Sequence, residues 1–136
     1  MRNSISILIL LFVFLVCLSI KAKEWTEITR GQNGHIFFVN MGNLNENKGY
    51  IYFWKLINYS NQDEYGDMSA KIYVKAECEV FKFKWLKISY HKMFMAKDYV
   101  KPNNPSKLVS GWQFPSIGST SHAVLDHVCK NKGLLL

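Results

Sequence analysis

The feature that most constrains this 136-residue chain is a pair of cysteines, Cys78 and Cys129, in a sequence that begins like an export signal. Arg2 is followed by a long apolar stretch, and Ala22 then precedes the first charged cluster. A charged start, an apolar core and a small residue are typical of a signal peptide, so we expect residues 1–22 to be removed. Because exported proteins fold in an oxidising compartment, the two remaining cysteines are expected to form a disulfide.

The leader leaves two alternatives open. Its apolar core, residues 5–20, is shorter than the roughly 20 residues of a membrane-spanning helix, which favours cleavage over anchoring in the inner membrane. Cys17 would be a lipidation site, but Leu15 and Val16 before it are larger than lipoprotein processing usually accepts. We therefore expect one domain, residues 23–136, that is periplasmic, secreted or on the cell surface and touches a membrane only if the leader stays uncleaved.

Composition narrows the class of partner. Two of the 17 basic residues and none of the 10 acidic residues lie in the leader, so the exported domain has a net charge of about +5. Arg30 is its only arginine, although arginine is the usual side chain for bidentate recognition of phosphate or guanine. The sequence therefore disfavours specific nucleic-acid binding and leaves extracellular proteins, envelope proteins and anionic polymers as candidate partners.

The first half of the domain has the pattern of β-strands. Short apolar runs over 25–29 and 35–39 are separated by Asn33-Gly34, which is a strong hairpin signal. Residues 50–59 are rich in aromatic and β-branched side chains and have no helical period, which predicts a strand. Because both faces of that strand are largely apolar, we expect it to lie centrally in the sheet.

The next segments continue the strand pattern. Residues 70–80 alternate between apolar and polar side chains, and this alternation turns Cys78 toward the buried face. From 81 to 95 the pattern continues as strand but changes phase near Trp85 and Leu86. A one-residue change of phase is what a β-bulge produces, so we expect a bulge or bend there.

The last element is predicted to be a helix of about three turns. Candidate N-caps precede apolar residues at helical spacing: Ser119, Thr120 and Ser121, then Val124, Leu125, Val128 and Cys129. Gly133 is placed to end the helix. Since Cys129 lies on the inner face, its disulfide to Cys78 would staple the helix to the sheet and close a loop of about fifty residues. The expected fold class is α+β and mainly β.

No catalytic or metal-binding motif is present in the sequence, and we expect no enzymatic activity, metal or cofactor. His122 and His127 are five residues apart, which turns them roughly 140° from each other on a helix, so they do not form a metal-binding pair. The alternative is a small envelope hydrolase that uses Glu77, Glu79 and His91. That alternative requires a cleft in which these three groups meet. A purely structural envelope component is a further alternative.

Lysines and aromatic residues alternate after Cys78 and suggest a binding face. Such a mixture would bind an anionic polymer through its charges, or stack on sugars or bases through its rings. The competing interpretation places most of these aromatic residues in the core. The candidate face is made of Lys82, Lys84, Trp85, Lys87 and Lys92.

The order of these features resembles a known family. After the leader come WTEI, the aromatic run YIYFWKLINYS, the segments SAKIYVKAEC and KFKWLKISYHKMFM, then Trp112, Pro115 and a capped helix that ends near Cys129. This order is similar to that of the surface-adhesin protein E-like family of small exported bacterial proteins, over residues 25–130.

The resemblance implies both a fold and a role. The implied fold is an antiparallel sheet of about five or six strands, curled toward a half barrel, with one C-terminal helix packed on it and tethered by the disulfide. The implied role is that of an exported, non-enzymatic binding or surface-associated module, because the family is named for adhesion to host proteins. The resemblance supplies no compact binding motif, so no further site residues are transferred.

Overall fold

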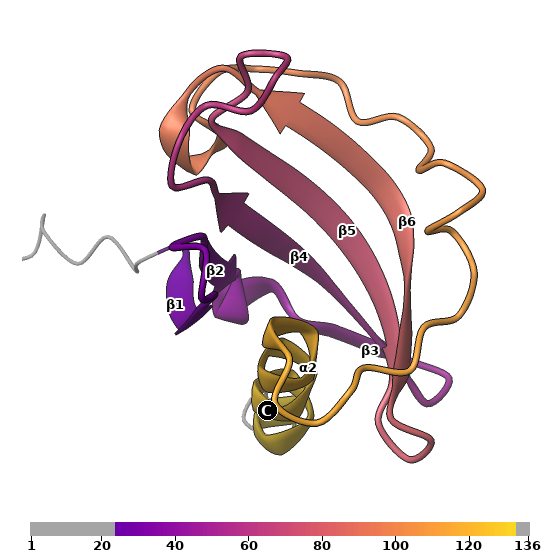
Figure 1. Ribbon diagram of the computed structural model, residues 1–136. Coiled ribbons are helices and arrows are strands. Elements are labelled where there is room, and N and C mark those ends of the chain that lie inside the picture. Colours follow the sequence, from indigo (N-terminus) through magenta and orange to yellow (C-terminus); the bar gives the residue numbers. More distant parts are fainter. Residues whose placement is uncertain (1–23, 133–136) are drawn as a thin grey trace, which may run out of the picture.

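The computed structural model describes residues 24–132, which form one antiparallel sheet and one α-helix (Figure 1). The strands are β1 Thr26–Arg30, β2 Ile36–Val39, β3 Asn45–Asn47, β4 Tyr50–Asn58, β5 Ser69–Glu77 and β6 Lys82–His91, and the helix is α2 Thr120–Asn131. Two short 3-10 turns, η1 Met41–Asn43 and η2 Phe94–Ala96, complete the elements. The expected leader and Gly133 lie outside the described residues. Within 24–132, no helix is long and apolar enough to cross a membrane.

The sheet is open and strongly curved. Its strand order is β1-β2-β4-β5-β6, with β3 paired to the first residues of β4 along the same edge that β2 occupies further on, and all pairings are antiparallel. The strand expected over 50–59 is β4, which ends at Asn58, and its predicted central position is confirmed. Figure 1 shows the sheet curling around α2, which lies inside the curl. The curled antiparallel sheet with one C-terminal helix matches the expected fold class.

The main core lies between the sheet and α2. Its buried members include Val39, Ile51, Phe53, Ile72, Val74, Ala76, Val124, Leu125 and Val128. Every second residue of β4 and β5 enters this core, because successive side chains of a strand point to opposite faces. Burial of each of the three α2 side chains contributes roughly 1.5–3 kcal/mol, so packing as well as the disulfide holds the helix.

The predicted bulge in β6 is confirmed. Tyr73 of β5 faces Lys87, whereas the next residue, Val74, faces Trp85, so that Leu86 is the extra residue. A bulge of one residue reverses which side of the sheet the following side chains occupy. Even-numbered residues before the bulge, such as Lys82 and Lys84, therefore lie on the same face of the sheet as odd-numbered residues after it, such as Lys87.

Two strands end several residues earlier than expected. The segment expected as strand over 70–80 ends at Glu77, and residues 78–81 form the turn into β6. Phe81 takes a positive φ of 59° in this turn. The strand expected to run to residue 95 ends at His91, where the chain leaves the sheet to form η2.

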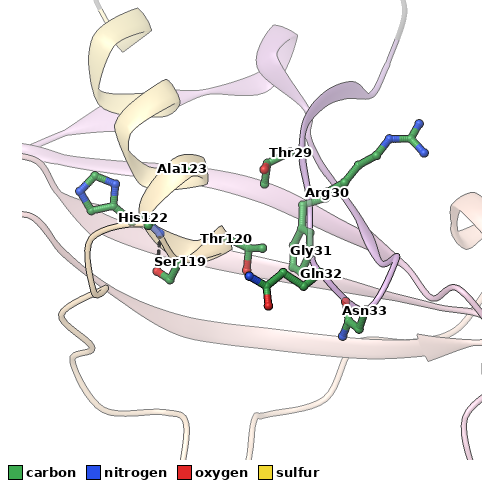
Figure 2. A pocket seen from close by; sticks show the side chains of 11 residues that line it. Thr29, Arg30, Gly31, Gln32, Asn33, Ser119, Thr120, His122 and Ala123 are labelled. Atoms are coloured by element: carbon green, nitrogen blue, oxygen red, sulfur yellow. Dashed lines mark hydrogen bonds between the residues drawn. The ribbon is translucent and has the colours of Figure 1, made fainter.

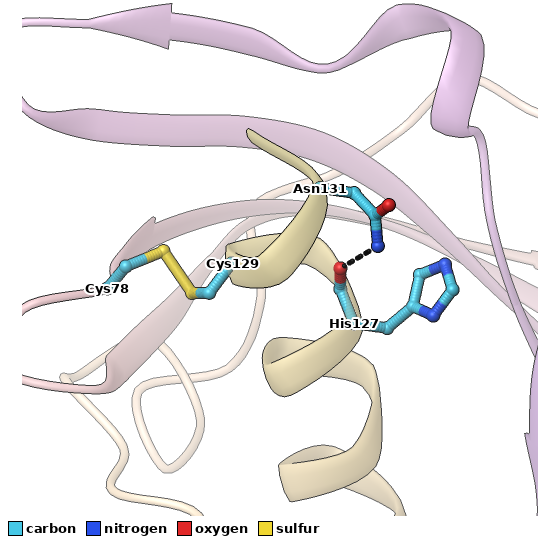
Figure 3. The surroundings of a disulfide bond; sticks show 4 residues. All are labelled: Cys78, His127, Cys129 and Asn131. Atoms are coloured by element: carbon cyan, nitrogen blue, oxygen red, sulfur yellow. Dashed lines mark hydrogen bonds between the residues drawn. A yellow bond between two sulfur atoms is a disulfide. The ribbon is translucent and has the colours of Figure 1, made fainter. Parts of the chain in front are cut away.

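The disulfide and the helix cap are both present. Cys78 and Cys129 are bonded, with their Cα atoms 5.6 Å apart, and the bond joins the turn after β5 to the last turns of α2 (Figure 3). At the other end of α2, the Ser119 side chain accepts a hydrogen bond from the backbone N–H of His122 at 3.1 Å, as an N-cap does. The helix is thus fixed at both ends.

The long connection from β6 to α2, residues 92–118, runs beside β6 (Figure 1). It pairs with β6 at two points, where Phe83 bridges Gln113 and Ile88 bridges Asn103. These bridges occupy part of the hydrogen-bonding edge of β6, which would otherwise be free to pair with another chain. The connection also brings Trp112 next to the sheet.

Candidate binding surface

The two faces of the sheet have different environments. One face, the helix face, packs against α2. The opposite side is the outer face. At the end of the sheet near Asn58 and Ser69, this face is covered by η2 and by a second apolar cluster around Trp25, Phe38 and Leu56. Toward the other end of β4, β5 and β6, the outer face carries half-buried and exposed side chains. This uncovered part is the candidate binding surface.

Lysines and aromatic rings dominate this surface, which we call the lysine–aromatic face. Its members are Tyr50, Tyr52, Trp54, Lys71, Tyr73, Lys75, Lys82, Lys84, Lys87 and Trp112. The strand residues point outward because they alternate with the core residues of β4 and β5. The bulge at Leu86 allows Lys82, Lys84 and Lys87 to share the face although their spacing is uneven.

Four of the five ammonium groups lie against the rings, whereas Lys87 Nζ donates a hydrogen bond to Asn104 Oδ1 at 2.7 Å. Lys75 Nζ is 3.8 Å from the ring centre of Tyr50, and Lys71 Nζ is 4.6 Å from that of Trp54. Trp112 reaches over from the 92–118 connection, and Lys82 and Lys84 approach its ring to 4.6 and 5.0 Å. Each exposed contact of this kind is worth about 0.5–1 kcal/mol, so the rings hold the lysines in a fixed arrangement.

The face has an excess of positive charge. Lys82 Nζ lies 2.9 Å from a carboxylate oxygen of Glu77. Among the described residues, the other lysines of the face form no ion pair. Lys75 and Lys84 are directly opposite each other in the β5–β6 register. Like charges at such positions are destabilising, so this pairing does not serve the stability of the sheet. With five lysines and one glutamate, the face carries four uncompensated positive charges.

The structure brings together three of the five residues of the predicted binding face. Lys82, Lys84 and Lys87 lie on the lysine–aromatic face. Trp85 lies on the helix face, where it packs against the core. Lys92 lies beyond the end of β6 and binds Asp67 at 2.7 Å. Trp85 and Lys92 are therefore outside the site, because strand alternation turns Trp85 to the helix face and Lys92 lies beyond the end of β6.

The remaining members of the face were missed by sequence reasoning. Both faces of the strand expected over 50–59 are largely apolar, so its pattern does not set Tyr50, Tyr52 and Trp54 apart, and Lys71 and Lys75 lie outside the segment from which the binding face is predicted. The alternation of lysine with apolar residues in 70–77 was the available signal. Trp112 gave no signal, because its contact with Tyr50, at 6.1 Å between ring centres, joins residues far apart in the sequence.

A cleft of about 510 Å³ lies on the other side of the molecule, between the β1–β2 hairpin and the first turn of α2 (Figure 2). Thr29, Gln32 and Thr120 contribute to its lining. Its cationic residue, Arg30, binds Glu27 through its guanidinium at 2.8 Å and is exposed. The side chains labelled in Figure 2 form neither a nucleophile–base pair nor a charged pocket. We therefore assign no function to this cleft.

The groups of the alternative hydrolase site are far apart. Glu77 pairs with Lys82 at one end of the β5–β6 ladder, whereas His91 pairs with Ser69 at the other end. Glu79 lies in the turn after β5. This set therefore forms no common cleft. Within residues 24–132 there is also no group of three side chains suited to holding a metal ion.

His91 belongs to a different cluster that the sequence did not predict. Its Nε2 lies 2.8 Å from Ser89 Oγ, and its Nδ1 lies 2.9 Å from the backbone oxygen and 3.4 Å from the carboxylate of Asp98. Burial raises the pKa of Asp98, but hydrogen bonds from its own backbone and from Lys92 and Met93, together with the charge of His91, lower it overall. The cluster ties the chain after β6 back onto the sheet.

One charged group lies inside the core. Lys55 of β4 points to the helix face and is 4% exposed. Its Nζ lies 5.2 Å from the ring centre of Trp85 and 5.8 Å from that of Phe83, beside a small cavity that reaches Ser121. Burial without a carboxylate partner lowers the pKa of Lys55 to about 8. Sequence reasoning missed this group, because the residues that bury it come from β6 and α2.

Comparison with known proteins extends over the whole described fold. A family model described as surface-adhesin protein E matches residues 25–130. Among solved structures, the crystal structure of protein E from non-typeable Haemophilus influenzae matches with a TM-score of 0.60 and 10% sequence identity. The match covers 85% of this chain and 82% of that one, and at this identity it shows the likeness of the fold alone. No curated protein sequence matches the chain.

Proposed function

Because this chain belongs to the surface-adhesin protein E family, we propose that it is an exported binding module without enzymatic activity that contacts extracellular molecules through its lysine–aromatic face. The family supports an adhesin-like role. The observation that supports this site is the ordered array of lysines on open sheet surface, with Lys75 and Lys84 opposed at a cost in stability. Exposed charges that do not stabilise a fold are candidates for recognition of a partner.

Export is part of this proposal. We propose that the leader, residues 1–22, is removed and that the mature protein begins at Lys23, so the domain is free to act outside the cytoplasm. Retention of the leader would instead anchor the same domain at the inner membrane. Mass spectrometry of the protein recovered from cell fractions gives the N-terminus and the compartment together. A protein recovered only with detergent and with residues 5–20 intact would contradict this part of the proposal.

We expect the purified mature domain to bind saturably to a host extracellular-matrix preparation in a biosensor titration. The variant Lys84→Glu is expected to weaken this binding at least tenfold, about 1.4 kcal/mol, because it places a carboxylate among the lysines. The matched control is Lys132→Glu, which makes the same change of charge after α2, on the opposite side of the sheet. Absence of saturable binding to the matrix or to envelope fractions, or equal effects of the two variants, would contradict the proposal.

A serine hydrolase is the second candidate function, since Ser89, His91 and Asp98 follow the order of nucleophile, base and orienting acid. Ser89 is only 2% exposed, so a substrate would reach its hydroxyl only after the chain beyond β6 moved away. We expect a fluorophosphonate probe to leave the protein unlabelled. Ser89→Ala should lower the free energy of unfolding by about 1–2 kcal/mol, because it removes the partner of a buried ring nitrogen. Labelling that disappears in Ser89→Ala would establish the hydrolase instead.

A further inference from the structure

The aromatic rings of the lysine–aromatic face are already engaged within the protein. Tyr50 has Trp112 stacked at 6.1 Å and Lys75 Nζ at 3.8 Å, and Trp54 has Tyr73 at 4.9 Å between ring centres. Binding of bases or sugars by stacking needs an exposed ring face. These rings therefore serve to hold the ammonium groups in place, and the charges are the groups presented to a ligand.

The lysines form an array rather than a pocket. Lys71 and Lys75 come from β5, and Lys82, Lys84 and Lys87 come from β6. Neighbouring strands are about 4.8 Å apart and alternate residues of a strand are about 7 Å apart, so the side chains start from a grid of these spacings. A grid suits a chain that repeats its anionic groups, whereas a single small anion needs convergent donors.

Every positive charge of this array belongs to a lysine. The described chain has one arginine, Arg30, in β1, which is not part of the face. Lysine acts as a point charge toward an anion, and it lacks the planar fork that reads guanine or clamps a phosphate in two places. Together with the engaged rings, this composition favours an anionic polysaccharide over a nucleic acid as the ligand.

We propose that the lysine–aromatic face binds a linear anionic polysaccharide, with sulfate or carboxylate groups contacting the ammonium groups of Lys71, Lys75, Lys84 and Lys87. This inference rests on the proposed adhesin function and names the class of partner for the same site. The cost of opposing Lys75 and Lys84 is offset when an anionic group lies between them. The cation–π contacts reduce the loss of side-chain entropy on binding, because the ammonium groups are ordered beforehand.

The test uses heparin as a sulfated polysaccharide immobilised on a biosensor, with the mature domain titrated at several salt concentrations. We expect the double variant Lys75→Gln/Lys84→Gln to bind at least tenfold more weakly. Its plot of log affinity against log salt should be less steep by about two, one for each lost contact. Thermal melting of this variant should show stability close to that of the parent, because relief of the like-charge pair offsets the loss of the cation–π contacts of Lys75 and Lys84.

The control variant Lys130→Gln/Lys132→Gln loses the same charge at the end of α2 and is expected to keep most of the affinity and the salt dependence. An equal effect of this control pair would show that binding follows net charge alone and would overturn the inference. Absence of heparin binding, or a DNA duplex that binds as tightly as heparin, would overturn it as well. If matrix binding survives removal of the polysaccharides by lyases, the inference fails while the proposed adhesin function stands.

Discussion

Replacing Cys78 and Cys129 together by serine is expected to lower the free energy of unfolding by roughly 2–5 kcal/mol. The bond joins residues 51 apart, and chain entropy alone assigns roughly 4 kcal/mol to closing a loop of this length. A small domain has only about 5–15 kcal/mol of stability in total, so the loss is a large share of it. Denaturant titration of the variant and the parent measures the difference.

The loss should be uneven along the chain. The last turns of α2 depend on the disulfide and on the packing of Val128, whereas β4 and β5 are held by a long ladder of backbone hydrogen bonds. Amide hydrogen exchange should therefore rise first in α2. The parent protein treated with reductant is the matched control and should behave as the serine variant does. Equal stability of oxidised and reduced parent, with free thiols confirmed, would contradict this expectation.

Replacing Lys55 by methionine is expected to stabilise the protein at pH 7 by about 3 kcal/mol. Burial lowers the pKa of Lys55 from 10.5 to about 8, and each unit of such a shift corresponds to about 1.4 kcal/mol of disfavour toward the charged form. Below pH 8 the folded protein must bury a charged ammonium group that water solvates in the unfolded chain. Methionine fills a similar volume without the charge, so the cost disappears.

The same group predicts how stability depends on pH. Between about pH 8 and 10.5 the unfolded chain keeps a proton on Lys55 that the folded protein has released, so the stability of the parent rises with pH. Burial and nearby charges raise the pKa of Tyr59 to about 12, so above pH 10 its unfolded form loses the proton first and stability falls again. We expect the free energy of unfolding of the parent to reach a maximum near pH 10. In Lys55→Met, the rise in stability below pH 10 should be absent.

Denaturant titrations at pH values from about 7 to 11 test this expectation, since the series then spans the rise and the fall. Lys71→Met, on the lysine–aromatic face, is the matched control and should retain the rise in stability with pH, because Lys71 is not buried in the core. A parent protein whose stability is flat over this range would show that the ammonium group of Lys55 reaches water in the folded state.

Local patterns in the sequence determine most of this fold. The alternation expected over 70–80, the change of phase near Leu86 and the serine or threonine cap of the helix each depend on a few neighbouring residues. The structure confirms the alternation as far as Glu77, the bulge, and Ser119 among the three candidate caps. The turn at 78–81 could not be predicted in this way, because it contains none of the glycine, proline, asparagine or aspartate residues that mark turns. Phe81 has a positive φ in this turn, a conformation that is uncommon for a bulky residue and that no local pattern signals.

The site was harder to predict than the fold. Lys82, Lys84 and Lys87 could be named because they are close in the sequence, but the face they share also depends on β4, β5 and Trp112. Long-range packing decides which lysines lie on the outer face of the sheet and which are buried in the core. Lys55 and Lys75 have similar apolar neighbours along their strands, yet α2 covers only the side on which Lys55 lies.

The covalent loop between Cys78 and Cys129 encloses the whole connection 92–118. That connection carries the most accessible large apolar residues of the described chain, with Tyr99, Leu108 and Ile117 all more than 90% exposed. Endopeptidases cut preferentially at such exposed segments. A single cut there would leave two fragments that remain joined through sulfur, with every strand of the sheet on one fragment and α2 on the other. A nicked molecule would therefore keep its strands, its lysines and its helix together after the chain has been cut.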